Sequence, residues 1–130
     1  MSNDWDWNIN LPEGCPPESA HVCNGIFFYR IVEEEVSEHD FVCNRTRRQE
    51  KDYSNQLCIA SGISIDKDLN AIKKTVELPA LRDEYNNPRV ARIELLEDDG
   101  KVNQTGNRPT HYTFWRTEYF DFQNTIEIIE

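Results

Sequence analysis

The chain has 130 residues, a length that fits one domain with a single hydrophobic core. Its hydrophobic fraction is only 38%, but aromatic residues make up 11% and supply the bulk of a core, which argues against general disorder. Its 24 acidic and 14 basic residues give a net charge of −10, which argues against nucleic-acid binding because neutralising phosphates needs clustered Lys and Arg.

Residues 1–24 are predicted to form an irregular lead-in, because Pro12, Gly14, Pro16 and Pro17 interrupt regular structure. The first residues lack the basic and apolar parts of a signal peptide. No apolar run approaches the roughly 20 residues that a helix needs to cross a bilayer. We therefore expect a cytoplasmic protein without a membrane partner.

The four cysteines, at positions 15, 23, 43 and 58, contain no Cys-x-x-Cys pair. In a reducing compartment they are expected to stay thiols, with the last two buried, and not to build a disulfide framework. The cysteines and histidines of the first half match no zinc knuckle or ribbon in their spacing, so no metal is expected. The set in question is Cys15, His21, Cys23, His39 and Cys43.

A buried strand is predicted over residues 26–32, which are aromatic or β-branched except for Arg30. Alternation places Arg30 on the same face as Phe28 and Val32. A permanently charged guanidinium on an apolar face needs a polar or anionic partner. Two partners are open, an internal carboxylate such as the nearby Asp40 or the phosphate of a ligand.

Ser37 is predicted to cap a short helix over residues 38–42. Residues 44–56 contain the one basic stretch of the chain and almost no apolar periodicity, so they are predicted to form an exposed, mobile loop. A cover over an anion site is the alternative interpretation of this loop. A second apolar segment, residues 57–65, is broken by Gly62.

A helix capped by Asp66 is predicted to run up to Pro79 on the strength of an apolar stripe at helical spacing. Short strands together with one or two early helices indicate an α+β domain over residues 25–130, built around a small, mostly antiparallel twisted sheet. The remaining strands are predicted over residues 89–95, near Val102, over residues 110–115 and over residues 125–129.

Three places combine a strand context with unusual polar side chains. Tyr29 and Arg30 form the first, as candidate ligand-binding residues. Ser61 and Ser64 form the second, because the glycine between them lets the backbone approach a ligand and their hydroxyls are suited to a ribose. Each place also has a structural interpretation, in which Arg30 pairs with a buried carboxylate and the serines belong to a turn before a helix.

The third place is a strand on which His111, Thr113 and Trp115 share one face and form a plausible floor for a flat ring. An isolated strand histidine also occurs for purely structural reasons. Glu118 is the carboxylate nearest to this strand, so Glu118 and His111 are the candidate catalytic residues. No Gly-rich phosphate loop, Ser-His-Asp order or metal triad is present, and the sequence leaves enzymatic activity open.

Four motifs between about residues 25 and 116 resemble a family of small uncharacterised bacterial proteins. That family shares a tyrosine-arginine strand, an aspartate-phenylalanine pair, a glycine-containing serine segment and a histidine-threonine-tryptophan strand. The resemblance brings no established activity with it. The matching segments are residues 27–32, Asp40–Phe41, residues 61–65 and residues 111–115.

The order of these motifs also resembles, more distantly, the ADP-ribosyltransferase fold. The resemblance implies NAD as ligand, with Arg30 at its phosphates or ribose, Ser64 bracing the site and Glu118 at the nicotinamide ribose. The serines here are spaced Ser-Gly-Ile-Ser, whereas the fold carries Ser-x-Ser, and no Glu-x-Glu or Gln-x-Glu follows. This interpretation predicts an NAD- or nucleotide-binding protein of bacterial conflict or regulatory systems.

A second function is compatible with the same sequence. The charge of −10, the small size and the aromatic content suit a non-enzymatic interaction protein, such as an immunity protein, antitoxin or inhibitor, that masks a basic protein surface. What faces Arg30 distinguishes the two functions, since a ligand phosphate requires an open cleft and an internal carboxylate does not.

Overall fold

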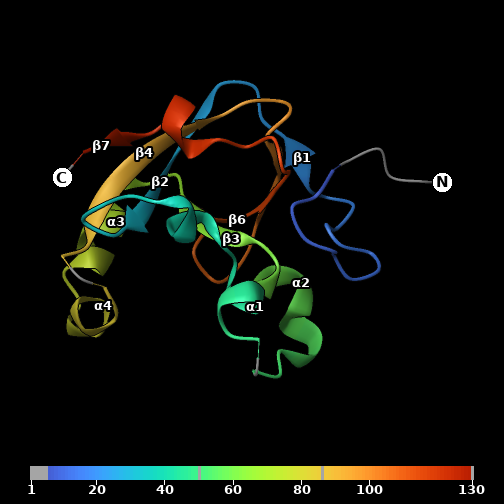
Figure 1. The fold of residues 1–130 in the computed structure, drawn as a ribbon, viewed down its shortest axis with the longest axis horizontal. Helices are drawn as coiled ribbons and strands as arrows, with labels where there is room; N and C mark the ends of the chain where they lie inside the picture. Colours follow the sequence, from blue (N-terminus) through green and yellow to red (C-terminus); the bar gives the residue numbers. More distant parts are fainter. Residues whose placement is uncertain (1–5, 50, 86, 130) are drawn as a thin grey trace.

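A computed structural model describes residues 6–49, 51–85 and 87–129, and its central element is a single antiparallel sheet (Figure 1). Its strand order is β1-β5-β6-β3-β2-β4-β7. The prediction of an α+β domain around an antiparallel sheet is confirmed at this level. The strands are β1 (His21–Val22), β2 (Ile26–Val32), β3 (Ile63–Asp66), β4 (Arg89–Leu95), β5 (Gly100–Gln104), β6 (His111–Arg116) and β7 (Glu127–Ile128).

The helices are short and gather mainly on one side of the sheet, with α1 and α2 below it in Figure 1. The longest of them, α3, packs against β2, β3 and β4. No helix in the described part of the chain is long and apolar enough to cross a membrane. The helical elements are η1 (Glu38–Phe41), α1 (Asn44–Arg47), η2 (Ser54–Gln56), α2 (Leu57–Ala60), α3 (Leu69–Val76), α4 (Pro79–Glu84) and η3 (Phe122–Asn124).

The connections show that the sheet curls. Residues 23–25 join β1 to β2 and residues 96–99 join β4 to β5, although the strands of each pair stand far apart in the strand order. These two short connections bring the margins of the sheet toward each other at this end. There the amide of Gly25 extends the β2–β4 ladder by donating to the carbonyl of Leu95 at 2.9 Å. The inner face of the curled sheet holds the aromatic and aliphatic core. The core residues are Cys23, Phe28, Val32, Phe41, Ile63, Ile65, Ala91, Ile93, Leu95, Val102, Phe114, Phe120 and Phe122.

Strands β2 and β3 separate after a single pair, and this separation positions the site. Strand β2 pairs with β4 along its whole length, but in the described chain its register with β3 consists of Tyr29 opposite Asp66 alone. Beyond that pair the two strands diverge. Arg30, on the inner face of β2, lies directly at the start of this opening.

Two local predictions differ from the structure in their capping residues. Asp68, not Asp66, caps α3 by accepting from the amide of Asn70 at 2.9 Å. Asp66 instead ends β3 fully buried, where its carboxylate accepts from the amide of Asp68 and pairs with Arg108. Pro79 begins α4, because a proline at the first helical position loses no hydrogen bond. Ser37 does precede η1 as its N-cap residue, as predicted.

The expectation of four thiols is wrong. Cys15 and Cys58 form a disulfide across a sequence separation of 43, while Cys23 and Cys43 are free and buried. The pairing joins the lead-in to α2, two segments whose proximity depends on the fold and leaves no trace in the spacing of the cysteines. Burial also raises the pKa of the Cys23 thiol, which Lys67 opposes and Asp99 reinforces.

Candidate functional site

Arg30 is held by backbone carbonyls. It is 8% exposed, and its Nε donates to the carbonyl of Asp40 at 2.7 Å while Nη1 donates to the carbonyl of Ser64 at 2.6 Å. Ser64 lies on β3, so the guanidinium bridges β2 and β3 where their ladder has ended. The Cζ atom of the Arg30 guanidinium also lies 5.9 Å from the ring centroid of Phe41.

The carboxylate of Asp40 is occupied elsewhere. Its two oxygens accept from the amides of Glu33, at 3.0 Å, and Ser37, at 2.9 Å. Arg30 therefore donates to the main-chain carbonyl of Asp40, and within the described chain no hydrogen bond joins it to the carboxylate of that residue. Burial lowers the pKa of Arg30 to about 10. Tyr85 and Asp40 oppose this shift, and the nearby charge of Arg47 reinforces it. The guanidinium stays charged at neutral pH, without a carboxylate bonded to it in the described chain.

A pocket of about 360 Å³ opens beside this guanidinium. It lies between the diverging strands and the segment that carries α1, η2 and α2. Three of its lining residues are cations, and no Asp or Glu lies among the described ones. The lining residues are Arg30, Val42, Cys43, Arg47, Lys51, Tyr53, Gln56, Ile59, Ala60, Gly62, Ile63, Ser64 and Tyr85.

The basic stretch at residues 44–56 supplies a further wall of this pocket. It contains α1 and η2, and the hydroxyl of Tyr53 donates to the carbonyl of Arg48 at 3.1 Å. The ammonium of Lys51 lies 5.5 Å from the ring centroid of Tyr53. Within the described chain, the guanidinium of Arg47 has no hydrogen-bond or ion-pair partner. This stretch thus brings two further cations to a pocket that already holds Arg30.

Ser64, which also lines this pocket, meets His111, which does not, on the outer face of the sheet. The hydroxyl of Ser64 lies 3.2 Å from Nε2 of His111, and Nδ1 of His111 lies 3.0 Å from the carbonyl of Thr105. Because a carbonyl only accepts, Nδ1 carries the proton and Nε2 accepts from the Ser64 hydroxyl. Thr113 is 1% exposed, and its hydroxyl lies 2.8 Å from that of Thr105.

Ser61 follows the last residue of α2, and Trp115 of β6 holds this helix against the sheet. The hydroxyl of Ser61 donates to the carbonyl of Leu57 at 2.8 Å. The indole of Trp115, 1% exposed, donates to the carbonyl of Cys58 at 2.8 Å. Position 62, just after α2, requires glycine, because a Cβ there would lie 2.4 Å from Cγ2 of Thr113. The contacts of this region link α2, β3 and β6 to one another.

The remaining candidates lie outside the Arg30 pocket. Tyr29 is half-buried on the outer face of β2, opposite to Arg30 by strand alternation. Glu118 is exposed, its amide donates to the carbonyl of Asp6 at 2.9 Å, and it lines two other hollows of the surface. The structure therefore joins Arg30 and the backbone of Ser64 in one pocket and places the other predicted residues elsewhere.

Sequence reasoning did not assign Arg47, Lys51, Tyr53, Gln56 and Tyr85 to a site. The clustering of Arg and Lys in an acidic chain was the available signal for the first two, through the alternative of a cover over an anion site. Tyr85 had no such signal, because it follows α4 and reaches the pocket through the fold alone.

No group of three or more His, Cys, Asp and Glu side chains is placed to hold a metal ion within residues 6–49, 51–85 and 87–129. Comparison of the chain with protein-family models, curated proteins and solved structures gives no match.

Proposed function

We propose that the Arg30 pocket binds a small phosphate-bearing molecule of the nucleotide class, NAD and ADP-ribose included. The observation that carries this proposal is the gathering of Arg30, Arg47 and Lys51 around one pocket in a chain of net charge −10. Like charges repel, so three cations on one cavity are favourable when an anion occupies it. The volume lies within the range of about 300–1,000 Å³ that is typical of small-molecule sites.

The geometry of Arg30 suits a phosphate. A guanidinium has five N–H donors, and the two bonds to Asp40 and Ser64 leave three for a ligand. The two carbonyls fix the plane of the guanidinium, so that less side-chain entropy is lost when a ligand binds. Tyr53 and Tyr85 offer aromatic surface for a base or another ring.

The proposal is binding without group transfer. Glu118 and His111, the candidate catalytic residues, do not line the Arg30 pocket. A general acid or base must lie within hydrogen-bonding reach of the reacting group. The fold supplies no such carboxylate among the described residues of the pocket, so ADP-ribosyl transfer by Glu118 has no geometric support.

Arg47→Ala is expected to weaken the binding of ADP-ribose about 10- to 100-fold, because a charge-assisted hydrogen bond is lost in a partly enclosed site. Arg47 is half-buried and unpaired in the described chain, so its removal leaves the fold intact. Arg48→Ala is the matched control, since it removes the same charge from the same segment without touching the pocket. Isothermal titration calorimetry with NAD, ADP-ribose and pyrophosphate measures the effect.

Equal affinities for the Arg47→Ala and Arg48→Ala variants would contradict the proposal, because they would reduce the effect to net charge. Absence of binding of all three probes to the unaltered protein at low salt would also contradict it. If pyrophosphate alone binds, the pocket is an anion site, and the part of the proposal that names a nucleotide is wrong.

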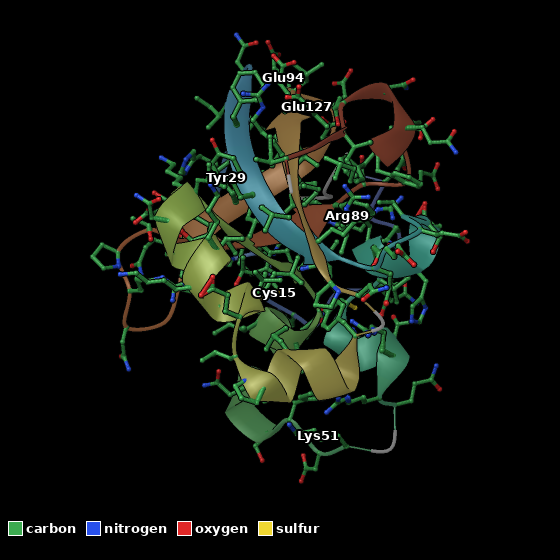
Figure 2. All side chains as sticks on the ribbon, turned by 90° about the vertical axis from the view of Figure 1, so that its left-hand side faces the viewer. Cys15, Tyr29, Lys51, Arg89, Glu94 and Glu127 are labelled. Carbon is green, nitrogen blue, oxygen red and sulfur yellow. A yellow bond between two sulfur atoms is a disulfide. The ribbon has the colours of Figure 1, made fainter. Side chains whose placement is uncertain are left out.

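A specific surface favours the second candidate, an interaction protein for a basic partner. Four large apolar side chains at one end of the sheet are more than 40% exposed, and carboxylates stand among them. Figure 2 shows Glu94 and Glu127 at this end of the molecule and Lys51 at the opposite end. The apolar residues are Val22, Ile26, Phe27 and Leu96, and the neighbouring carboxylates in the chain are Glu94, Glu97 and Asp98.

Phe27→Ser is expected to abolish a stoichiometric, salt-sensitive complex recovered by pull-down from the source cells, since apolar contacts at an interface centre carry much of the affinity. Leu78→Ser removes a side chain of similar exposure from another part of the surface and is the control. A complex that tolerates Phe27→Ser, or no complex at low salt, would count against this candidate.

A further inference from the structure

We infer that the Cys15–Cys58 disulfide is a redox control on the Arg30 pocket, in which the oxidised form binds ligand and the reduced form binds it weakly. This inference rests on the proposed function and adds its regulation. It follows from where the disulfide lies. Cys58 is in α2, and Cys15 is in the lead-in, which contributes no residue to the described lining of the pocket.

Helix α2 is a wall of the pocket. Ile59 and Ala60, the two residues after Cys58, line the cavity, and the chain then continues through Gly62 into β3. A displacement of Cys58 is therefore passed along the backbone to Ser64, whose carbonyl accepts from Arg30. The disulfide ties α2 to the lead-in through Cys58, which does not itself line the pocket.

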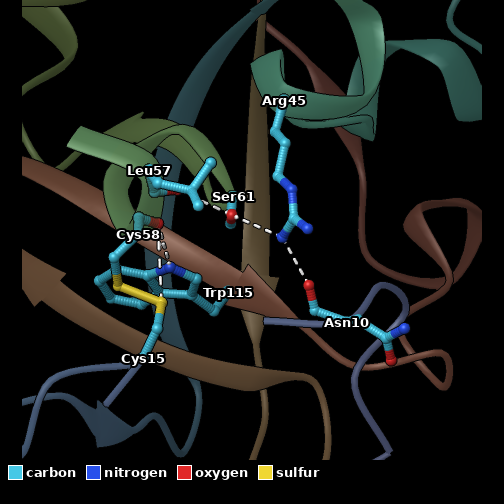
Figure 3. Close-up of a disulfide and its surroundings, with 7 residues drawn as sticks. All are labelled: Asn10, Cys15, Arg45, Leu57, Cys58, Ser61 and Trp115. Atoms are coloured by element: carbon cyan, nitrogen blue, oxygen red, sulfur yellow. Dashed lines mark hydrogen bonds between the residues drawn. A yellow bond between two sulfur atoms is a disulfide. The ribbon is translucent and has the colours of Figure 1, made fainter. Parts of the chain in front are cut away.

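The lead-in also contacts the second wall, α1. Figure 3 shows Arg45 of α1 between the carbonyl of Asn10 and the hydroxyl of Ser61, with the disulfide beside them. The distance from Nη1 of Arg45 to the Ser61 hydroxyl is 3.2 Å. Residues 10–15 thus join α1, through Arg45, to α2, through Cys15. Helix α1 carries Arg47, one of the three pocket cations.

Reduction removes the covalent half of this connection and leaves the rest of the fold. A dithiol reductant supplies two electrons and two protons, the sulfur–sulfur bond breaks to give two Cys thiols, and the dithiol becomes a disulfide. Cys15 and Cys58 are both half-buried and lie outside the fully buried core, so we expect the disulfide to react with a small dithiol. The Trp115 bond to the carbonyl of Cys58 keeps α2 on the sheet, so we expect a loosened wall and not an unfolded protein.

The test compares ADP-ribose affinity and backbone amide exchange in the oxidised protein and after dithiothreitol. We expect reduction to weaken binding at least tenfold and to speed exchange over residues 8–15 and 57–61. The Cys15→Ser/Cys58→Ser variant should bind as weakly as the reduced protein, with or without dithiothreitol. Cys23→Ser, which removes a free thiol away from the pocket, should keep the redox dependence.

A second variant avoids dependence on the cysteine pair. Arg45→Gln removes the contact between the lead-in and α1 without changing the disulfide, and it is expected to weaken binding about threefold to tenfold in the oxidised state.

Equal affinity in both redox states overturns the inference, whether or not amide exchange changes. If neither state binds ADP-ribose or pyrophosphate while exchange over residues 57–61 still responds to reduction, the proposed function fails and its regulation fails with it. If the affinity for ADP-ribose falls on reduction but amide exchange over residues 57–61 is unchanged, the inference that α2 transmits the redox change to the pocket is wrong.

Discussion

Arg30→Met is expected to lower the free energy of unfolding by about 2–4 kcal/mol and to weaken nucleotide binding a hundredfold or more. The guanidinium is buried and bridges the two diverging strands through the carbonyls of Asp40 and Ser64. Methionine fills much of the volume but leaves both carbonyls without their donor, at about 1–3 kcal/mol for each unsatisfied group. The relief from burying a charge offsets part of this loss.

Arg30→Lys separates the two roles of the side chain. Lysine keeps the charge but cannot present the planar fork that reaches two carbonyls at once. We expect it to fall between the unaltered protein and Arg30→Met in both properties. Urea unfolding and calorimetry with ADP-ribose measure them. A fully stable Arg30→Met variant would show that the two carbonyl bonds contribute nothing net, and unchanged affinity would remove Arg30 from the binding site.

Loss of the disulfide is expected to cost about 4 kcal/mol of stability, because the cross-link closes a sequence separation of 43 and restricts the unfolded chain. For a domain of this size that corresponds to a fall in melting temperature of about 10 °C or more. Thermal unfolding of the Cys15→Ser/Cys58→Ser variant beside the unaltered protein measures the difference.

Dithiothreitol supplies the control for this prediction. It should lower the melting temperature of the unaltered protein to that of the Cys15→Ser/Cys58→Ser variant and leave the variant unchanged. Thiol titration in denaturant should find only Cys23 and Cys43 before reduction and all four cysteines after it. Four reactive thiols in the unreduced, freshly purified protein would contradict the disulfide itself.

The strands were predictable where the sequence alternates or runs apolar for long enough. The predictions over residues 26–32 and 89–95 coincide with β2 and β4, because packing on the inner face and local β-propensity agree there. For residues 57–65 the sequence predicted an apolar segment in a strand context, broken by Gly62, because a short apolar run does not by itself distinguish a strand from a helix turn. The segment contains both, with α2 ending just before Gly62 and β3 beginning after it.

The site was predictable only at its centre. Arg30 is conspicuous because a charge on an apolar strand face contradicts the local pattern. The partners of Arg30 were not predictable. Both of its hydrogen bonds go to main-chain carbonyls, and every residue carries such a carbonyl, so the sequence does not show which of them lies near the guanidinium. The pocket residues on α1 and η2, and Tyr85 after α4, come together through long-range packing that a single sequence does not encode in any periodicity.

The single pair between β2 and β3 has a mechanical consequence. In terms of backbone hydrogen bonds, the described sheet consists of two plates, β1-β5-β6-β3 and β2-β4-β7, joined at Tyr29 and Asp66. This seam has the shortest main-chain ladder of the described sheet, and the packing of α3 and the bonds of Arg30 hold its two sides together instead. The pocket draws its walls from both plates, with Arg30 on one and Ile63 on the other. A ligand bound in the pocket would contact both groups of strands and restrict their motion relative to each other.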